Sequence, residues 1–90
     1  MSIRMELSSV FGRFTGNQLN FEVKGSTIGE CVRYLVKKFP ELDNMLLDKQ
    51  GKLRPSFDVY LNDKSTYPEK LARPVKDGDK INLMMLILGG

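Results

Sequence analysis

Four stretches of the chain alternate hydrophobic with polar residues, which is the period of a half-buried strand. They predict strands near residues 2–9, 18–24, 56–61 and 80–87. In the first stretch Ile3, Met5 and Leu7 alternate with polar neighbours. The segment FGRFTGNQ, which contains two glycines, separates this stretch from the next one. We therefore expect the first two strands to form a hairpin.

A helix is predicted over residues 27–39. Thr27 and Glu30 have the spacing of a capping box, hydrophobic residues then recur at helical spacing, and Pro40 ends the pattern. A shorter helix is expected in ELDNMLLD. The segment YPEKLARPV contains two prolines and is expected to be an irregular connection with room for one helical turn.

The order of these elements is strand, strand, helix, strand, connection, strand. A single main helix covers only one face of a sheet, so the sequence predicts an α+β roll. The β-grasp arrangement fits this order, with the first and last strands parallel and adjacent at the centre. No linker, repeat or low-complexity segment interrupts the chain, and we expect one domain over residues 1–90.

The composition narrows the chemistry. The chain has no histidine and one cysteine, Cys31, which leaves no ligand set for structural zinc and no Ser-His or Cys-His pair. Cys31 lies beside the hydrophobic stripe of the predicted helix, where we expect a buried thiol. Asp77 and Asp79, in KDGD, indicate a turn rather than a calcium loop. We expect no free-standing enzyme, no metal site and no bound cofactor.

The basic residues outnumber the acidic ones, with a net charge of +3, but they alternate with acids along most of the length. We therefore expect no nucleic-acid partner. The N-terminal MSIRMELSS lacks the hydrophobic stretch of a signal peptide, and the longest hydrophobic run, Leu83–Leu88, is too short to cross a bilayer. These features predict a cytoplasmic protein with no membrane association.

The last residues are LILGG, and two glycines are an unusual end for a strand. If Ile81 and Leu83 point to the helix, Met84, Leu86 and Leu88 point away from it. These three side chains either form an exposed surface for a partner or cover a gap at the sheet. Glycine has no Cβ and accepts any backbone conformation, so Gly89 and Gly90 suit a chain end that enters a narrow active site in another protein.

Four stretches, STIGECVRYLVKKFPEL, GKLRPSFDVYLND, PVKDGDKINL and the final GG, resemble ubiquitin-like sulfur carriers of the MoaD/ThiS family, which includes the small subunit of molybdopterin synthase. The resemblance implies that a ubiquitin-activating-type adenylyltransferase uses ATP to adenylate Gly90, which then becomes a thiocarboxylate. Gly89, which has no side chain, would let the chain end fit into the active site of this enzyme. A sulfur-accepting synthase, here the molybdopterin synthase large subunit, would be the second partner. Met84 falls where relatives carry an exposed aromatic residue, so we expect it to be substantially exposed.

The sequence departs from the resemblance just before the glycines, where MMLIL stands in place of proline and small residues. Several alternatives therefore stay open. The activated glycine could be transferred to lysines of target proteins, or the sulfur could serve cysteine or homocysteine, tRNA or thiamine synthesis. An alternative from another functional class is a β-grasp domain that only binds other proteins and whose terminal glycines have no chemical role.

Overall fold

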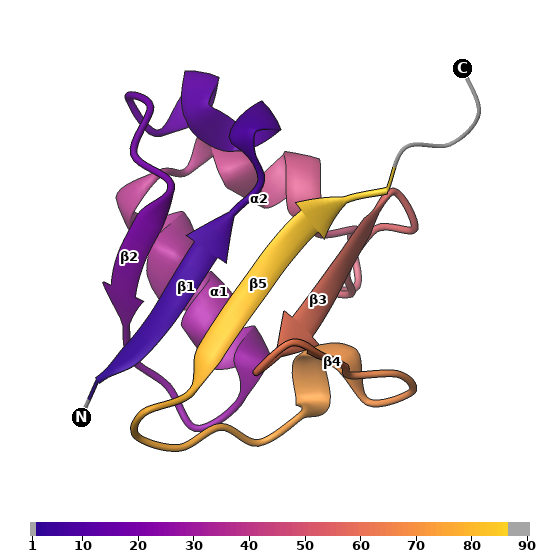
Figure 1. The fold of residues 1–90 in the computed structure, drawn as a ribbon. Helices are drawn as coiled ribbons and strands as arrows, with labels where there is room; N and C mark the ends of the chain where they lie inside the picture. The colour runs from indigo at the N-terminus through magenta and orange to yellow at the C-terminus, as the bar shows by residue number, and fades with distance from the viewer. Residues whose placement is uncertain (1, 87–90) are drawn as a thin grey trace.

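Five strands form one mixed sheet in the computed structural model of this chain, which describes residues 2–86 (Figure 1). The strands are β1 (Ile3–Leu7), β2 (Asn20–Val23), β3 (Phe57–Leu61), β4 (Lys64–Ser65) and β5 (Lys80–Met85). Their spatial order is β2-β1-β5-β3-β4. The first and last strands, β1 and β5, are parallel neighbours at the centre, and the other pairs are antiparallel. The predicted α+β class and the β-grasp arrangement are confirmed.

The main helix, α1 (Ile28–Lys38), begins at the predicted cap. The Glu30 N–H donates to Thr27 Oγ1 at 3.2 Å, which satisfies one of the free donors of the first turn. The Glu30 carboxylate accepts from the Ser26 N–H at 2.7 Å, one residue before the donor of a standard capping box. The short helix α2 (Glu41–Leu46) follows Pro40, as the sequence predicts.

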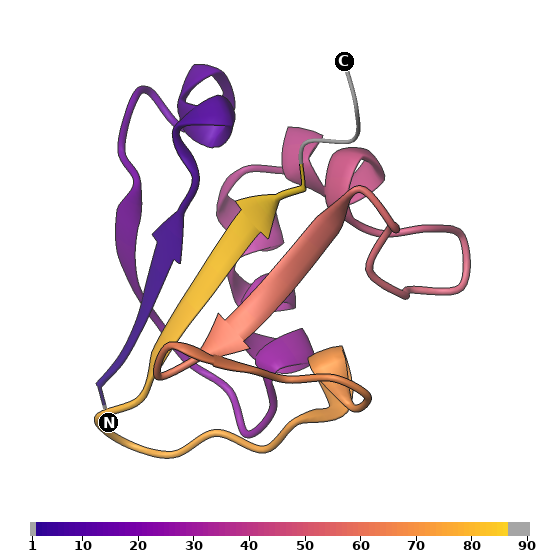
Figure 2. The same ribbon diagram turned by 45° about the vertical axis from the view of Figure 1, so that its right-hand side comes forward.

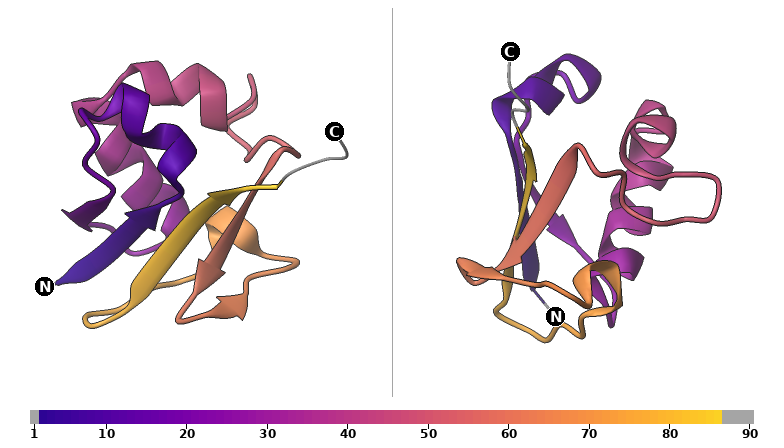
Figure 3. Two further views of the ribbon diagram at one scale, coloured as in Figure 1. Left: turned by 45° about the horizontal axis from the view of Figure 1, so that its top comes forward. Right: turned by 90° about the vertical axis from the view of Figure 1, so that its right-hand side faces the viewer.

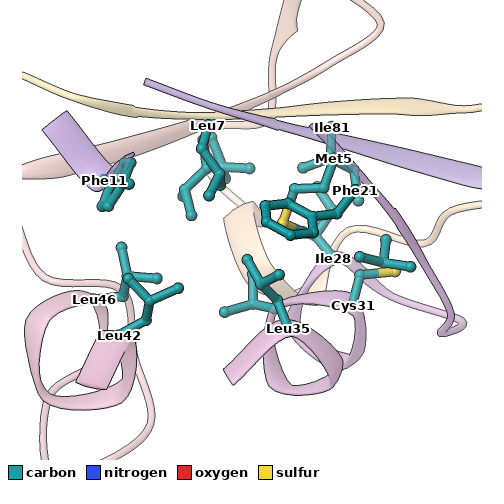
Figure 4. Packing of buried hydrophobic residues seen from close by; sticks show 14 of the residues in the cluster. Met5, Leu7, Phe11, Phe21, Ile28, Cys31, Leu35, Leu42, Leu46 and Ile81 are labelled. Atoms are coloured by element: carbon teal, nitrogen blue, oxygen red, sulfur yellow. The ribbon is translucent and has the colours of Figure 1, made fainter. Parts of the chain in front are cut away.

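Both helices cover the same face of the sheet, as the view along the sheet shows (Figure 3). Side chains from the central strands meet side chains from the helices in one core (Figure 4). The labelled members of this core are Met5, Leu7, Phe11, Phe21, Ile28, Cys31, Leu35, Leu42, Leu46 and Ile81. No helix of residues 2–86 covers the other face of the sheet.

The segment after β1 is a 3₁₀ helix, η1 (Ser9–Phe14), which the sequence analysis did not predict. Phe11 explains it, because this side chain is fully buried and its ring lies 5.5 Å from that of Phe57. The expected helical turn in the second connection is η2 (Lys70–Ala72). Strand β4 was not predicted, and β5 ends at Met85, before the predicted limit.

Candidate functional site

Strand β5 ends beside Leu86, the last residue that the structure describes, and we call this end of the strand the chain exit. On one side the Ser8 N–H donates to the Leu83 carbonyl at 3.0 Å, and on the other the Leu86 N–H donates to the Ser56 carbonyl at 2.7 Å. The sheet therefore fixes the backbone as far as Leu86. Because β5 is a central strand, two neighbouring strands rather than a loop hold the backbone up to Leu86.

The turn that starts β5 is held by side chains. Asp79 accepts hydrogen bonds from Asn62 Nδ2 at 3.0 Å and from the Lys76 N–H at 2.9 Å. The bond from Asn62 is the main reason why the pKa of Asp79 lies below its usual value. Gly78 has a φ of 91°, which favours glycine. The expected turn in KDGD is thus confirmed, and it fixes the register in which β5 enters the sheet.

The open face of the sheet differs from the expected hydrophobic surface. Met84 is half-buried rather than substantially exposed, and its cross-strand neighbour is Asp58. Next to it, Asn82 pairs with Glu6 on β1 and Tyr60 on β3. The cross-strand partners of Met84 and Asn82 are therefore Asp58, Glu6 and Tyr60, each of which carries a polar group. The face combines one methionine with polar groups, where the sequence analysis expected a run of hydrophobic side chains.

Asn82 introduces an unpaired polar atom at the middle of this face. Its Oδ1 is buried and accepts no hydrogen bond from the residues that the structure describes. Such an acceptor costs about 1–3 kcal/mol relative to a paired one. This position is therefore not optimised for the stability of the domain alone.

The exposed hydrophobic surface lies instead at the end of β5. Met85 and Leu86 are each 39% exposed. Leu86 was expected at the surface, whereas Met85 was missed, because alternation assigns it to the covered face with Leu83. It is the last residue of its strand, where fewer neighbours cover a side chain. Leu88, Gly89 and Gly90, the other predicted site residues, lie outside the described residues.

Cys31 is confirmed as a buried thiol, with no exposed surface. Burial, helped by the nearby negative charge of Glu30, raises the pKa of this thiol to about 11. The thiolate, which is the nucleophilic form, is therefore scarce at neutral pH. Cys31 belongs to the packing of α1 against the sheet and offers little as a covalent site.

Within residues 2–86, no helix has the length and hydrophobicity needed to cross a membrane. The same part of the chain holds no group of three or more acidic, cysteine or histidine residues placed to bind a metal ion. The geometry thus provides a fixed chain exit with a small hydrophobic surface beside it.

Comparison with known proteins places this arrangement in a family. The ThiS family model matches residues 9–90, nearly the whole chain and the two final glycines. The chain belongs to the ThiS family. The resemblance to MoaD/ThiS carriers is therefore confirmed, and this ThiS family protein is one of a group of ubiquitin-like sulfur carriers and modifiers, which are small carrier proteins rather than catalysts.

Three similar proteins illustrate the family to which this chain belongs. It is 37% identical over 73 residues to ubiquitin-related modifier 1 of Encephalitozoon cuniculi, which covers 77% of this chain and 76% of that protein. It is similar to a chain of the BexX/CysO complex of Amycolatopsis orientalis, with 25% identity, a TM-score of 0.87, and coverage of 98% of this chain and 99% of that one.

A third similarity is to a chain in the complex of subunits 1 and 2 of the molybdopterin-converting factor of Helicobacter pylori. The identity is 26%, the TM-score is 0.61, and both chains are fully covered. Two of the three relatives are thus known as complexes with a protein partner.

Proposed function

We propose that this ThiS family protein carries sulfur as a thiocarboxylate on Gly90. The observation that carries the proposal is the family match, which extends through Gly89 and Gly90. The position of β5 supports it, because a central strand presents the chain at a fixed point up to Leu86. Four residues then remain, and they span at most about 14 Å when extended, which is enough to enter a partner's active site.

The chemistry begins with a carboxylate that is a poor acyl donor. An oxygen of the Gly90 carboxylate attacks the α-phosphorus of ATP and pyrophosphate leaves, which gives an acyl adenylate. A hydrosulfide-class nucleophile then attacks the acyl carbon and AMP leaves, which gives the thiocarboxylate. Both steps take place in a ubiquitin-activating-type adenylyltransferase. This chain holds no ATP itself and contributes the carboxylate, while Gly89 contributes a backbone without a Cβ.

The sulfur then passes to a synthase. We propose molybdopterin synthesis in the cytoplasm as the pathway, with the molybdopterin synthase large subunit as partner. The similarity to a chain of the Helicobacter pylori molybdopterin-converting factor supports this choice. The exposed Met85 and Leu86, with Met84 and Leu88, would contact the partner beside the chain exit. The same chemistry could also supply sulfur for the synthesis of cysteine or homocysteine, of thiolated tRNA or of thiamine.

A second function has one specific observation in its favour. The relative from Encephalitozoon cuniculi, 37% identical, is a ubiquitin-related modifier. The same acyl adenylate would then be transferred to a lysine of a target protein. Activation is identical in the two functions, and the acceptor distinguishes them.

The test is incubation of the full chain with ATP, the activating enzyme and a sulfur source, followed by mass spectrometry. Replacement of oxygen by sulfur and oxidation of a methionine give nearly equal mass changes, and this chain has 5 methionines. Trypsin cleavage after Lys80 allows the two changes to be distinguished by a thiol reagent, because the peptide 81–90 contains no cysteine. Its alkylation by iodoacetamide therefore marks a thiocarboxylate, and fragmentation assigns it to Gly90.

Three variants serve as controls. Deletion of Gly89 and Gly90 should abolish alkylation of this peptide. One residue added after Gly90 should abolish it too, because the carboxylate then lies about 3.5 Å beyond the α-phosphate. Gly90→Ala should slow the reaction. Alkylation that persists in the intact, extended chain contradicts the proposal. ATP-dependent conjugates to lysine, without alkylation of the peptide, would support the modifier function instead.

A further inference from the structure

The two edges of the sheet differ in how many of their outward backbone groups already form hydrogen bonds. At the β3 edge, the Val59 N–H donates to the Asp58 carboxylate at 2.8 Å, and the Val59 carbonyl accepts from Thr66 Oγ1 at 2.7 Å. Strand β4 pairs with Tyr60 and Leu61 of β3, at the edge of the sheet that Figure 2 turns toward the viewer. Side chains and β4 thus occupy backbone groups that an added strand would need.

The β2 edge is open. The register and the hydrogen bond from the Leu7 N–H to the Leu19 carbonyl, at 2.8 Å, direct residues 19, 21 and 23 toward β1. The backbone groups of Asn20, Glu22 and Lys24 therefore point outward. Gln18 Nε2 donates to the Asn20 carbonyl at 3.1 Å. The Glu22 N–H and carbonyl and the Lys24 N–H have no partner in the part of the chain that the structure describes.

A groove of about 370 Å³ adjoins the open edge, between the end of β2 and the outer face of α1. Its lining residues are Lys24, Gly25, Glu30, Arg33, Tyr34 and Lys37. Tyr34 is half-buried and gives the groove a hydrophobic wall. Lys24, Arg33 and Lys37 are exposed and form no ion pair with any described residue. Glu30, the one acid, already accepts from the Ser26 N–H.

We propose that the β2 edge and this groove bind an extended, acidic segment of a partner protein. The segment would add a strand to β2 through the free N–H and carbonyl groups of Glu22 and the N–H of Lys24. Acidic side chains at its end would lie near Lys24, Arg33 and Lys37, and a hydrophobic side chain between them would rest on Tyr34. A peptide matches the alternating donors and acceptors of a strand edge, which a nucleic-acid backbone does not.

This surface is separate from the chain exit. Strand β1 lies between β2 and β5, and Val23 pairs with Ile3 at the start of β1, whereas Leu7 at its end pairs with Leu83. The groove is therefore at the opposite end of the sheet from Leu86. The inference does not depend on sulfur chemistry at Gly90.

The experiment titrates the full-length ¹⁵N-labelled protein with a synthetic peptide of alternating valine and threonine flanked by aspartate and glutamate. Binding should shift the amide resonances of Glu22 and Lys24 and slow their hydrogen exchange. A peptide with lysine in place of the acids should bind about tenfold more weakly or worse. The titration extends to about 1 mM, so that a weak complex is seen.

Glu22→Pro is the sharpest variant, because proline removes the outward N–H and is tolerated at a strand edge. It should bind the peptide at least about tenfold more weakly. Glu22→Ala keeps the N–H and should bind as the wild type does. If Glu22→Pro does not give the dispersed NMR spectrum of a folded domain, two charge-reversal variants test the proposal in its place. Arg33→Glu with Lys37→Glu should abolish binding, whereas the matched pair Lys49→Glu with Lys52→Glu should not.

Three results would overturn the proposal. One is the absence of any shift at Glu22 and Lys24 at the highest peptide concentration. The second is equal binding of the acidic and lysine-flanked peptides. The third is protection of the Glu22 amide without peptide, in a species of twice the mass, which would make a second copy of this chain the occupant.

Discussion

Leu83 and Leu86 are two leucines near the chain exit, one in the core and one at the surface. Leu83 is 1% exposed and Leu86 is 39% exposed. Leu83→Ala removes three carbons, which costs about 2.4 kcal/mol in transfer free energy and about 3–4 kcal/mol with the cavity that remains. Leu86→Ala removes the same atoms from a side chain already 39% exposed, so its cost is at most about 1.5 kcal/mol.

Urea and thermal unfolding of the two variants should therefore differ. A difference of about 1.5 kcal/mol or more corresponds to about 6–12 °C in Tm for a domain of this size. The two variants should rank in the opposite order when their loss of affinity for the activating enzyme is compared. Leu86→Ala should weaken it by more than about 1 kcal/mol if this residue is central to the interface, and Leu83→Ala, at a temperature where it is folded, should leave it unchanged. Equal loss of stability, or an effect of Leu83→Ala alone on binding, would refute the assignment.

Three further predictions concern the scaffold. Asn82→Val should raise the free energy of unfolding by about 1 kcal/mol, because it removes the unpaired Oδ1, and a lower value in urea unfolding would contradict this. Cys31, with a pKa of about 11, should be on the order of one-thousandth thiolate at pH 8 and react with a disulfide reagent only after unfolding. The lowered pKa of Asp79 stabilises the fold above its unfolded value of 3.8, so stability should fall as the pH drops below about 4. That fall should be shallower in Asp79→Asn, measured by urea unfolding across the pH range.

The sequence predicted the central strands well, because both are buried on one face and their alternation is regular. In β1, Ile3 and Met5 are fully buried, and in β5 Ile81 is fully buried too. The pattern failed where tertiary packing decides the structure. The glycines of FGRFTGNQ suggested a loop, but Phe11 fills the core beside Phe57 and folds the segment into η1. A single buried side chain in a short segment has no period that a sequence pattern could reveal.

The candidate site was predicted in outline. Alternation assigned Met84 to the open face, but it could not show that this residue would be half-buried and paired with Asp58. The exposure of Met85 was missed, because the alternation of a strand does not show where the layer that covers it ends. The open β2 edge was not predicted at all. Which residues of a strand face outward depends on the register with the neighbouring strand, and the sequence alone does not give it.

The parallel pairing of β1 and β5 separates the two proposed surfaces in space. Strand β1 runs with β5, and β2 runs against both, so β2 ends where β5 begins. Six residues of β5, from Lys80 to Met85, span about 20 Å at the usual rise per residue. Two strand spacings, about 10 Å, separate β5 from β2 across the sheet. A segment bound at Lys24 would therefore leave the surface around Leu86 free, and one partner could hold the domain by its edge while another receives the chain end.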